Sequence, residues 1–421
     1  MRSNIEQYIV KLAEGAKKAS YELATLSTSQ KNKAITLMAK ALVRNKRFIL
    51  KENKKDIRAA EAKGMSKALV DRLRLNDKRI KLMADSLREI VKLRDPVGET
   101  IDSWKRPNGL LISKTRTPIG VIAIIYEARP NVTSDCIGLC LKSSNTVILK
   151  GGSEALRSNM AIYRTLKAVA KKTNIPSGAI SLIETTNRKA VDVLLRQDKH
   201  VHLVIPRGGE GLIQQVAKKS RIPVIKHYKG VCHIYVDKDV DVSMAQRVCF
   251  NAKVQRPSVC NAMEALLVHE DVAKKFLPAM IQQLQKAGVE IRGCSKTKKI
   301  CGKSVKNATS KDWGTEYLDL ILAVKVVGDF KTAVNHINQF GSGHSDAIMT
   351  KNKRTAKDFL KMVDSACVYS NASTRFTDGY EFGMGSEIGI STDKLHARGP
   401  MALEELTTYK YLVIGAGQIR Q

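Results

Sequence analysis

Short apolar segments alternate with helical patterns through the middle of the chain, and this alternation constrains the fold more than any other feature. The run Gly120-Val-Ile-Ala-Ile-Ile-Tyr126 is apolar enough for a strand that is covered on both faces. A helical pattern follows at 132–141, and a second apolar run at 145–150 leads into two glycines. Repeated with short glycine-containing turns, this unit predicts a doubly wound parallel sheet.

The rest of the chain is long enough for a second domain, since it has 421 residues and 43% hydrophobic composition. Residues 5–93 have helical apolar spacing with breaks near 27–29 and at Gly64, and residues 106–109 are typical of a hairpin turn before a strand at 110–116. Further strands are expected at 179–183, 203–205, 224–226, 231–236, 265–268, 320–327, 347–349, 366–370 and 409–414. Further helices are expected at 155–172, 211–219, 243–250, from 272 onward, and at 355–363.

Composition excludes several classes of protein. No run is long enough for a membrane helix and the N-terminus lacks a signal peptide's apolar core, so we expect a soluble, cytoplasmic protein with no membrane partner. The eight cysteines form no Cys-x-x-Cys pair and no zinc-ligand spacing with histidine, so no metal site is expected and reduced thiols are the simplest account.

The formal net charge of +32 makes nucleic acid a partner to consider, because such a charge favours polyanions. The basic residues are, however, dispersed over ordinary helix faces, and aromatic residues make up only 5% of the chain. No nucleic-acid-binding motif is found. We therefore expect a solvated basic surface and no specific nucleic-acid partner.

The segment 251–260 brings Cys260 to the start of the apolar strand expected at 265–268. The loop is polar and basic, with Lys253 and Arg256 ahead of the cysteine. Nearby positive charge and backbone N–H groups lower the pKa of a thiol and activate it as a nucleophile. The residues alone leave two interpretations open, a reactive thiol and a buried structural cysteine.

This segment resembles the active-site segment of the γ-glutamyl phosphate reductase (glutamate-5-semialdehyde dehydrogenase) family, a branch of the aldehyde dehydrogenase superfamily. The resemblance runs in the family's order from about Arg116 to the end of the chain. The other matching segments are Arg116-Thr-Pro-Ile-Gly-Val-Ile-Ala-Ile-Ile-Tyr-Glu-Ala-Arg-Pro-Asn131-Val-Thr, Val204-Ile-Pro-Arg-Gly-Gly209, Gly230-Val-Cys-His-Ile-Tyr-Val236, Asn371-Ala-Ser-Thr-Arg-Phe-Thr-Asp-Gly379 and Lys394-Leu-His-Ala-Arg-Gly-Pro400.

The resemblance implies an α/β, aldehyde dehydrogenase-like fold with two doubly wound Rossmann-like domains and a small oligomerisation flap. The implied ranges are 1–98 with 117–228 for a cofactor-binding domain, 229–370 for a catalytic domain, 99–116 with 400–421 for the flap, and 371–399 for a segment that returns near the active site. The residues alone also allow the hairpin to be a local one on the same domain. The family further implies a homodimer or homotetramer, with a glutamate 5-kinase as a possible partner.

The activity that the resemblance implies is the NADPH-dependent reduction of L-γ-glutamyl 5-phosphate to L-glutamate 5-semialdehyde and phosphate, the second step of proline biosynthesis from glutamate. Cys260 would form the thioester, and the side-chain amide of Asn131 would stabilise the oxyanion together with the backbone N–H of the cysteine. The alternatives are another phosphorylating, NADP-dependent semialdehyde dehydrogenase with a different acyl chain, and a basic nucleic-acid-binding scaffold that has lost its activity.

One departure from hydrolytic aldehyde dehydrogenases favours the acyl-phosphate chemistry. Those enzymes carry a glutamate, within a Glu-Leu-Gly-Gly segment, that activates water against the thioester. The corresponding segment here, Lys226-His-Tyr-Lys-Gly230, has no glutamate. The absence of this glutamate protects from hydrolysis a thioester that must react with hydride or phosphate.

The chain lacks the usual glycine motif for dinucleotides, since Gly383-Met-Gly-Ser-Glu-Ile-Gly389 has one residue too many and lies far from the first strand. Aldehyde dehydrogenases bind their nicotinamide cofactor without that motif, so the resemblance explains its absence. Lys150 would contact the adenosine ribose, and its charge suits the 2′-phosphate of NADPH or NADP. The full set of implied cofactor residues is Lys150, Gly151, Gly152, Arg207, Gly208, Gly209 and Asp319.

The implied substrate carries a carboxylate, an amine and a phosphate, so basic side chains are expected around it. The basic residues of the family-like segments are Arg129, Arg256, Arg375, His396 and Arg398. Any of these arginines can instead belong to a surface or scaffold ion pair. The sequence does not assign one of them to one group of the substrate.

Overall fold

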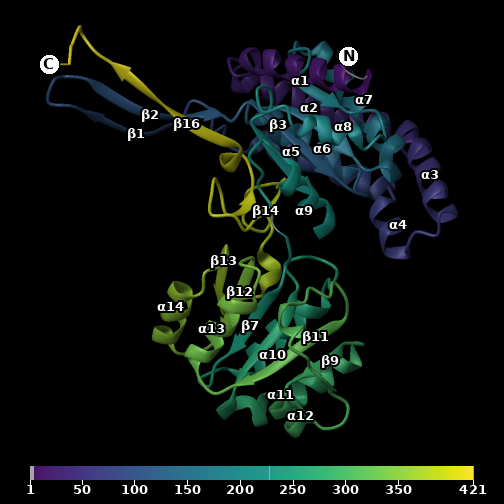
Figure 1. Ribbon diagram of the computed structural model, residues 1–421, viewed down its shortest axis with the longest axis vertical. Coiled ribbons are helices and arrows are strands. Elements are labelled where there is room, and N and C mark those ends of the chain that lie inside the picture. The colour runs from purple at the N-terminus through teal and green to yellow at the C-terminus, as the bar shows by residue number, and fades with distance from the viewer. Residues whose placement is uncertain (1–3, 227, 421) are drawn as a thin grey trace. The chain divides into compact units, whose positions relative to one another are not determined.

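The computed structural model describes residues 4–226 and 228–420 (Figure 1). The chain forms two compact units. Unit 1 comprises Met1–Lys226, Gly383–Gly389 and Met401–Gln421, and unit 2 comprises His227–Phe382 and Ile390–Pro400. The outermost positions of the expected domains, 1–3 and 421, and His227 of the segment that lacks a glutamate lie outside the described residues.

Unit 1 contains a four-stranded parallel sheet with the order β5-β4-β3-β6. Its strands are β3 (Val121–Tyr126), β4 (Thr146–Gly151), β5 (Ile180–Leu182) and β6 (Leu203–Arg207). The chain leaves β3 for β4 and β5 on one side and then crosses to β6 on the other. The order therefore reverses between β3 and β6, and ligands of such sheets bind at the carboxyl ends of the strands at this point.

The helices expected at 5–93 are present, and α2 begins with a capping box between Ser27 and Gln30. The expected strand at 224–226 is wrong, because only Val224 forms an isolated bridge, to Val204. Pro223 before it has no N–H to donate to a ladder. The helices of unit 1 are α1 (Asn4–Leu23), α2 (Thr28–Arg44), α3 (Lys46–Ala62), α4 (Lys67–Leu73), α5 (Asp77–Lys92), α6 (Asn131–Lys142), α7 (Leu156–Lys172), α8 (Lys189–Leu194) and α9 (Glu210–Lys219).

A separate antiparallel sheet in unit 1 joins the expected hairpin to the end of the chain. Its strands are β1 (Thr100–Lys105), β2 (Leu111–Pro118) and β16 (Thr407–Ile414), in the order β1-β2-β16. β16 pairs with β2 along its whole length, from Thr407 opposite Pro118 to Ile414 opposite Leu111. The C-terminal strand thus joins the hairpin as the third strand of this sheet, and Figure 1 shows the yellow β16 alongside β2.

Unit 2 contains a seven-stranded parallel sheet with the order β10-β9-β11-β8-β7-β12-β13. Its strands are β7 (Cys232–Val236), β8 (Met263–His269), β9 (Glu290–Gly293), β10 (Lys306–Asn307), β11 (Ile321–Val327), β12 (Ser345–Met349) and β13 (Cys367–Ser370). Its helices are α10 (Val242–Val254), α11 (Glu270–Lys286), α12 (Ser295–Cys301), α13 (Phe330–Phe340) and α14 (Lys353–Met362). The sequence prediction missed α13. Two short strands, β14 (Gly389–Ser391) and β15 (Gly399–Met401), follow.

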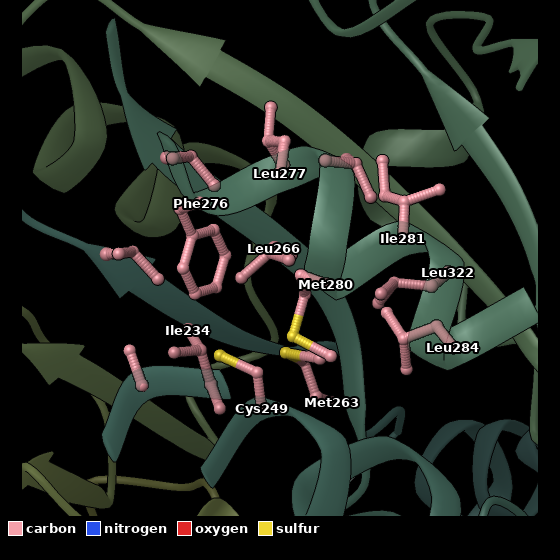
Figure 2. Packing of buried hydrophobic residues seen from close by; sticks show 14 of the residues in the cluster. Ile234, Cys249, Met263, Leu266, Phe276, Leu277, Met280, Ile281, Leu284 and Leu322 are labelled. Atoms are coloured by element: carbon pink, nitrogen blue, oxygen red, sulfur yellow. The ribbon is translucent and has the colours of Figure 1, made fainter. Parts of the chain in front are cut away.

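The core of unit 2 fixes the strands on which Cys260 depends (Figure 2). Phe276, Met280 and Leu284 on one face of α11 are completely buried against Leu266 of β8 and Leu322 of β11. Full burial of such side chains contributes roughly 1.5–3 kcal/mol each. The loop that ends at the start of β8 therefore has a rigid base. No helix in the described parts of the chain has the length and apolar character to cross a membrane.

Candidate active site

Cys260 lies just before β8, at the amino end of the unit 2 sheet, and is half-buried. The backbone of Gly230, just before β7, packs directly against it, since a Cβ at Gly230 would lie 2.0 Å from the Cys260 carbonyl oxygen. Only glycine allows this approach. Backbone contact between the residues that precede the neighbouring strands β7 and β8 therefore sets the position of the thiol.

The buried thiol of Cys232 contacts the backbone of the candidate nucleophile, Cys260. The Cys232 Sγ donates to the Cys260 carbonyl oxygen at 3.2 Å and lies 3.8 Å from Nδ1 of His344. Burial raises the pKa of Cys232. Cys232 therefore stays protonated and acts as a donor, whereas Cys260 is the accessible thiol of this pair.

Arg375 lies within electrostatic range of both Cys260 and Arg256. The Arg375 guanidinium donates to Gln255 Oε1 at 2.9 Å and to the side-chain oxygen of Asn261. Burial lowers the pKa of Arg375, and repulsion from Arg256 lowers it further, whereas Cys260 raises it. The loop 255–261 thus contains Arg256 and binds Arg375, and two cations near one thiol are suited to an anionic substrate.

Lys253 does not provide the free positive charge that the sequence suggested for the thiol. Its ammonium lies 2.5 Å from Glu264 Oε2, and both side chains are completely buried. Burial raises the pKa of Glu264 to about 7, while Lys253 opposes that shift. The Lys253–Glu264 ion pair joins the end of α10 to β8, which are the elements before and after the loop that contains Cys260.

Asn131 is the first residue of α6, at the carboxyl end of β3 in unit 1, and is exposed. Its Nδ2 donates to Asp135 Oδ2 at 3.1 Å. Ala128, three residues earlier, has a φ of 39°, which is unusual for a residue with a side chain and is typical of functional loops. Its N–H donates to Glu154 Oε1 at 2.6 Å.

Comparisons with known proteins identify relatives of this chain. The aldehyde dehydrogenase family model matches residues 5–298. The chain is 54% identical to a γ-glutamyl phosphate reductase of Thermodesulfovibrio yellowstonii over 99% of this chain and 100% of the relative, and 56% identical to one of Caldanaerobacter subterraneus over 97% and 99%.

A solved structure agrees at the level of the fold. The crystal structure of γ-glutamyl phosphate reductase from Thermotoga maritima matches with a TM-score of 0.96 and 49% identity, over 98% of this chain and 100% of that one. This chain belongs to the γ-glutamyl phosphate reductase family. The aldehyde dehydrogenase-like α/β fold expected from the sequence is confirmed.

Six of the residues predicted to bind the cofactor lie at the carboxyl ends of the unit 1 strands, whereas Asp319 lies in unit 2, just before β11. Lys150 near the end of β4 is buried, and its ammonium donates to the Gly151 carbonyl at 2.7 Å. A Cβ at Gly151 would meet the Asn159 amide at 2.1 Å, and one at Gly152 would meet the Glu154 carboxylate at 2.1 Å. Both glycines therefore keep the backbone close to neighbouring side chains.

Arg207, Gly208 and Gly209 connect β6 to the first turn of α9. The Gly209 N–H donates to Glu127 Oε2 at 2.9 Å, so one amide of this helix start is already satisfied by a carboxylate. The Arg207 side chain packs against Gly389, where a Cβ would lie 2.6 Å from Nη1. Glu127 was missed from the sequence because it is separated from Gly209 by 82 positions.

An open cavity of about 680 Å³ follows the last strand of the sheet on this side. Its lining is Tyr8, Leu156, Glu184, Thr185 and Thr186. Residues 184–186 come directly after β5, and Leu156 begins α7 after β4. The cavity is thus lined by residues that follow β4 and β5, and Lys150 is not among them.

The remaining predicted residues are placed as follows. Arg398 forms a two-point contact with Asp364, at 2.7 Å to Oδ1 and 2.7 Å to the carbonyl oxygen, as a scaffold arginine would. Asp319 is exposed, and its Oδ1 accepts from the N–H of Leu320 at 2.7 Å. His396 is exposed in unit 2, and Arg129 is exposed in unit 1 between β3 and α6.

The thiols carry no cross-links. All eight cysteines are free. Within the described residues, no three His, Cys, Asp or Glu side chains are grouped to hold a metal ion.

Proposed function

We propose that this chain reduces L-γ-glutamyl 5-phosphate with NADPH to L-glutamate 5-semialdehyde and phosphate, in the pathway from glutamate to proline. The observation that carries the proposal is its 54–56% identity, over at least 97% of the chain, to relatives that bear the reductase name. The accessible thiol with two neighbouring arginines is the local feature that supports it. We place the reaction in the cytoplasm, where eight free cysteines remain reduced.

Cys260 is the proposed nucleophile. Its thiolate forms a bond to the acyl carbon, the negative charge passes to the acyl oxygen, and the bond to phosphate then breaks to leave a thioester. Arg256 and Arg375 stabilise the negatively charged substrate and the leaving phosphate near the thiol. The Asn131 amide is the proposed side-chain donor to the oxyanion, together with the N–H of Cys260.

The second half of the reaction needs a nucleotide cofactor. NADPH, when bound, supplies hydride to the carbonyl carbon of the thioester. The resulting adduct releases the aldehyde and regenerates the Cys260 thiolate. Since no glutamate stands in the segment 226–230, this segment provides no carboxylate base that would direct water to the thioester.

The carboxyl edge of the unit 1 sheet fits NADPH. Lys150 would hold the adenosine ribose and its 2′-phosphate, Gly151 and Gly152 allow the backbone to approach it, and the cavity beyond β5 would take the adenine. The Glu154 carboxylate, which acts electrostatically on Lys150, accepts a hydrogen bond from the Ala128 N–H. Arg207 and Gly208 would contact the pyrophosphate, and Asp319 a ribose.

The three-stranded sheet is proposed as an oligomerisation flap. Five of the eight side chains of β16 are apolar or aromatic and exposed, including Tyr411 at 54%, Val413 at 56% and Ile414 at 64% of their full exposure. Exposed apolar side chains in this number are typical of a contact with another chain. We propose a homodimer or homotetramer, and a glutamate 5-kinase as a further partner that would deliver the labile acyl phosphate.

The decisive experiment runs the reaction in reverse. Purified protein is given glutamate 5-semialdehyde and NADP⁺ with and without inorganic phosphate, and NADPH formation is followed by absorbance. Phosphate-dependent formation supports the proposal. Formation without phosphate would indicate a hydrolytic aldehyde dehydrogenase, and no turnover in either case would favour another acyl chain or a binding scaffold.

A further inference from the structure

The start of α6 contains a contact that the reaction outlined above does not use. Asn131 and Asp135 lie four residues apart, and the Asn131 Nδ2 donates to Asp135 Oδ2 at 3.1 Å. The other carboxylate oxygen, Oδ1, accepts from the Ser86 hydroxyl of α5 at 3.0 Å. Asp135 thus connects the candidate oxyanion donor to a neighbouring helix.

This contact determines which end of the Asn131 amide faces outward. An ionised carboxylate only accepts hydrogen bonds, so it must face the NH₂ group and not the oxygen of the amide. The NH₂ group has two hydrogens, and the bond to Asp135 uses one. The second hydrogen is then held in a fixed direction, whereas an exposed asparagine without such a partner would exchange the positions of its oxygen and nitrogen.

The surroundings of the pair are rigid. The Ser134 hydroxyl donates to the Asn131 carbonyl at 2.8 Å, and Thr133 Oγ1 lies 2.7 Å from the hydroxyl of the buried Tyr126 on β3. Ser86 lies on α5, whose Leu87 side chain packs closely against Gly138 of α6. Asp135 is therefore held by elements that do not depend on a ligand.

We propose that Asp135 is a positioning residue for the reduction, because it fixes the Asn131 amide with an N–H toward the developing oxyanion. The inference rests on the proposed role of Asn131 as an oxyanion donor. Asp135 also joins α6 to α5 through its hydrogen bond from Ser86, so the experiment has to separate the positioning role from a structural one.

The energetics of Asp135 favour a functional role. Burial raises the pKa of its carboxyl group to about 6, although the hydrogen bonds from Asn131 and Ser86 and the charge of Arg207 act in the opposite direction. Since the folded pKa exceeds the usual value of 3.8, ionisation of this group lowers the stability of the fold as the pH rises through about 6. At neutral pH the carboxylate is therefore kept at a cost in stability.

The test is a double-mutant cycle with Asn131→Ala, Asp135→Asn and the double variant, measured as kcat, KM and Tm in the NADP⁺-reducing direction. We expect Asn131→Ala to lower kcat by about a hundred- to a thousandfold, and Asp135→Asn by about tenfold with KM nearly unchanged. The double variant should equal Asn131→Ala, and the Tm of Asp135→Asn should be unchanged or higher. Asp85→Asn, which removes the partly exposed partner of Arg88 on α5, is the matched control and should behave as wild type.

The outcomes separate the two proposals. Equal kcat values for Asp135→Asn and wild type, a further tenfold loss in the double variant, or a fall in Tm that accounts for the lost activity would overturn the positioning role while leaving Asn131 as the donor. A wild-type kcat for Asn131→Ala would instead remove the oxyanion role, and the inference with it.

A pH profile gives a second readout that a structural role would not change. Asp135 faces Arg207 of β6, and Cys136 follows it on α6. Protonation of Asp135 below pH about 6 removes the acceptor-only carboxylate that Asp135→Asn also removes. The ratio of wild-type to variant kcat should therefore fall toward one below that pH, and a ratio that stays constant contradicts the inference.

Discussion

The two sheets carry most of their candidate functional residues at opposite ends of the strands. In unit 1 the candidate residues follow β3, β4 and β6, at the carboxyl edge where parallel sheets usually bind ligands. In unit 2 Cys260 and Gly230 precede β8 and β7, so this site lies at the amino edge. The rule that ligands bind at the carboxyl ends of parallel strands therefore locates the candidate site of unit 1 and not that of unit 2.

The difference shows how each site is held. The unit 1 residues stand at helix starts, where side chains such as Glu127 and Glu154 take up backbone N–H groups and can move away from a ligand. The unit 2 thiol is held by backbone packing on Gly230 and by the completely buried Lys253–Glu264 pair. We therefore expect unit 2 to tolerate substitution less well than unit 1.

The largest effect is expected at the buried pair. Glu264→Gln leaves the Lys253 ammonium buried without an anion, so the free energy of unfolding should fall by about 3–5 kcal/mol. Asp192→Asn in unit 1, which removes the exposed partner of Lys219, is the control and should cost less than about 1 kcal/mol. Chemical denaturation measures both, and similar losses in the two variants would remove the contrast between the units.

The next effect concerns the close approach at Gly230. Gly230→Ala places a Cβ within 2.0 Å of the Cys260 carbonyl oxygen, so the thiol must move. A displacement of about 1 Å at a reacting group reduces kcat by roughly a hundredfold. Gly15→Ala in α1, where a Cβ meets nothing within 4 Å, should keep full activity. A fully active Gly230→Ala enzyme would show that the backbone contact does not position the thiol.

The same change in unit 1 should have a smaller effect. At Gly152 a Cβ would meet the end of the flexible Glu154 side chain, which can turn away and give up its bond to the Ala128 N–H. The loss of that bond is expected to raise KM for NADP⁺ by up to about tenfold with kcat nearly unchanged. Steady-state kinetics decide the point. A large fall in kcat would mean that this edge is as rigid as the Cys260 loop.

Much of the fold follows from local patterns. The apolar run at 121–126 predicted β3 because a strand covered on both faces needs apolar residues at every position, and β3 is completely buried. The pattern failed at 224–226, where one bridge to Val204 replaces a strand. α13 was missed, although its cap at Asp329 and its buried Ala333, Val334 and Ile337 follow ordinary helical spacing.

The site was less accessible to sequence reasoning. Cys260 and Asn131 were found through family-like segments, and their roles stay predictions. Lys253 was wrongly expected to supply free charge, because its partner Glu264 lies on another element, 11 positions away. Asp135 was detectable in principle, since a spacing of four places its side chain over Asn131 in a helix.

The most direct test of the account is the identity of the acylated residue. Enzyme is mixed with glutamate 5-semialdehyde and NADP⁺ without phosphate, quenched in acid and examined by intact and peptide mass spectrometry. The account predicts a γ-glutamyl adduct on Cys260 that phosphate discharges, that persists in Cys301→Ala and that is absent from Cys260→Ala. Turnover with no adduct, or an adduct on another residue, would contradict it.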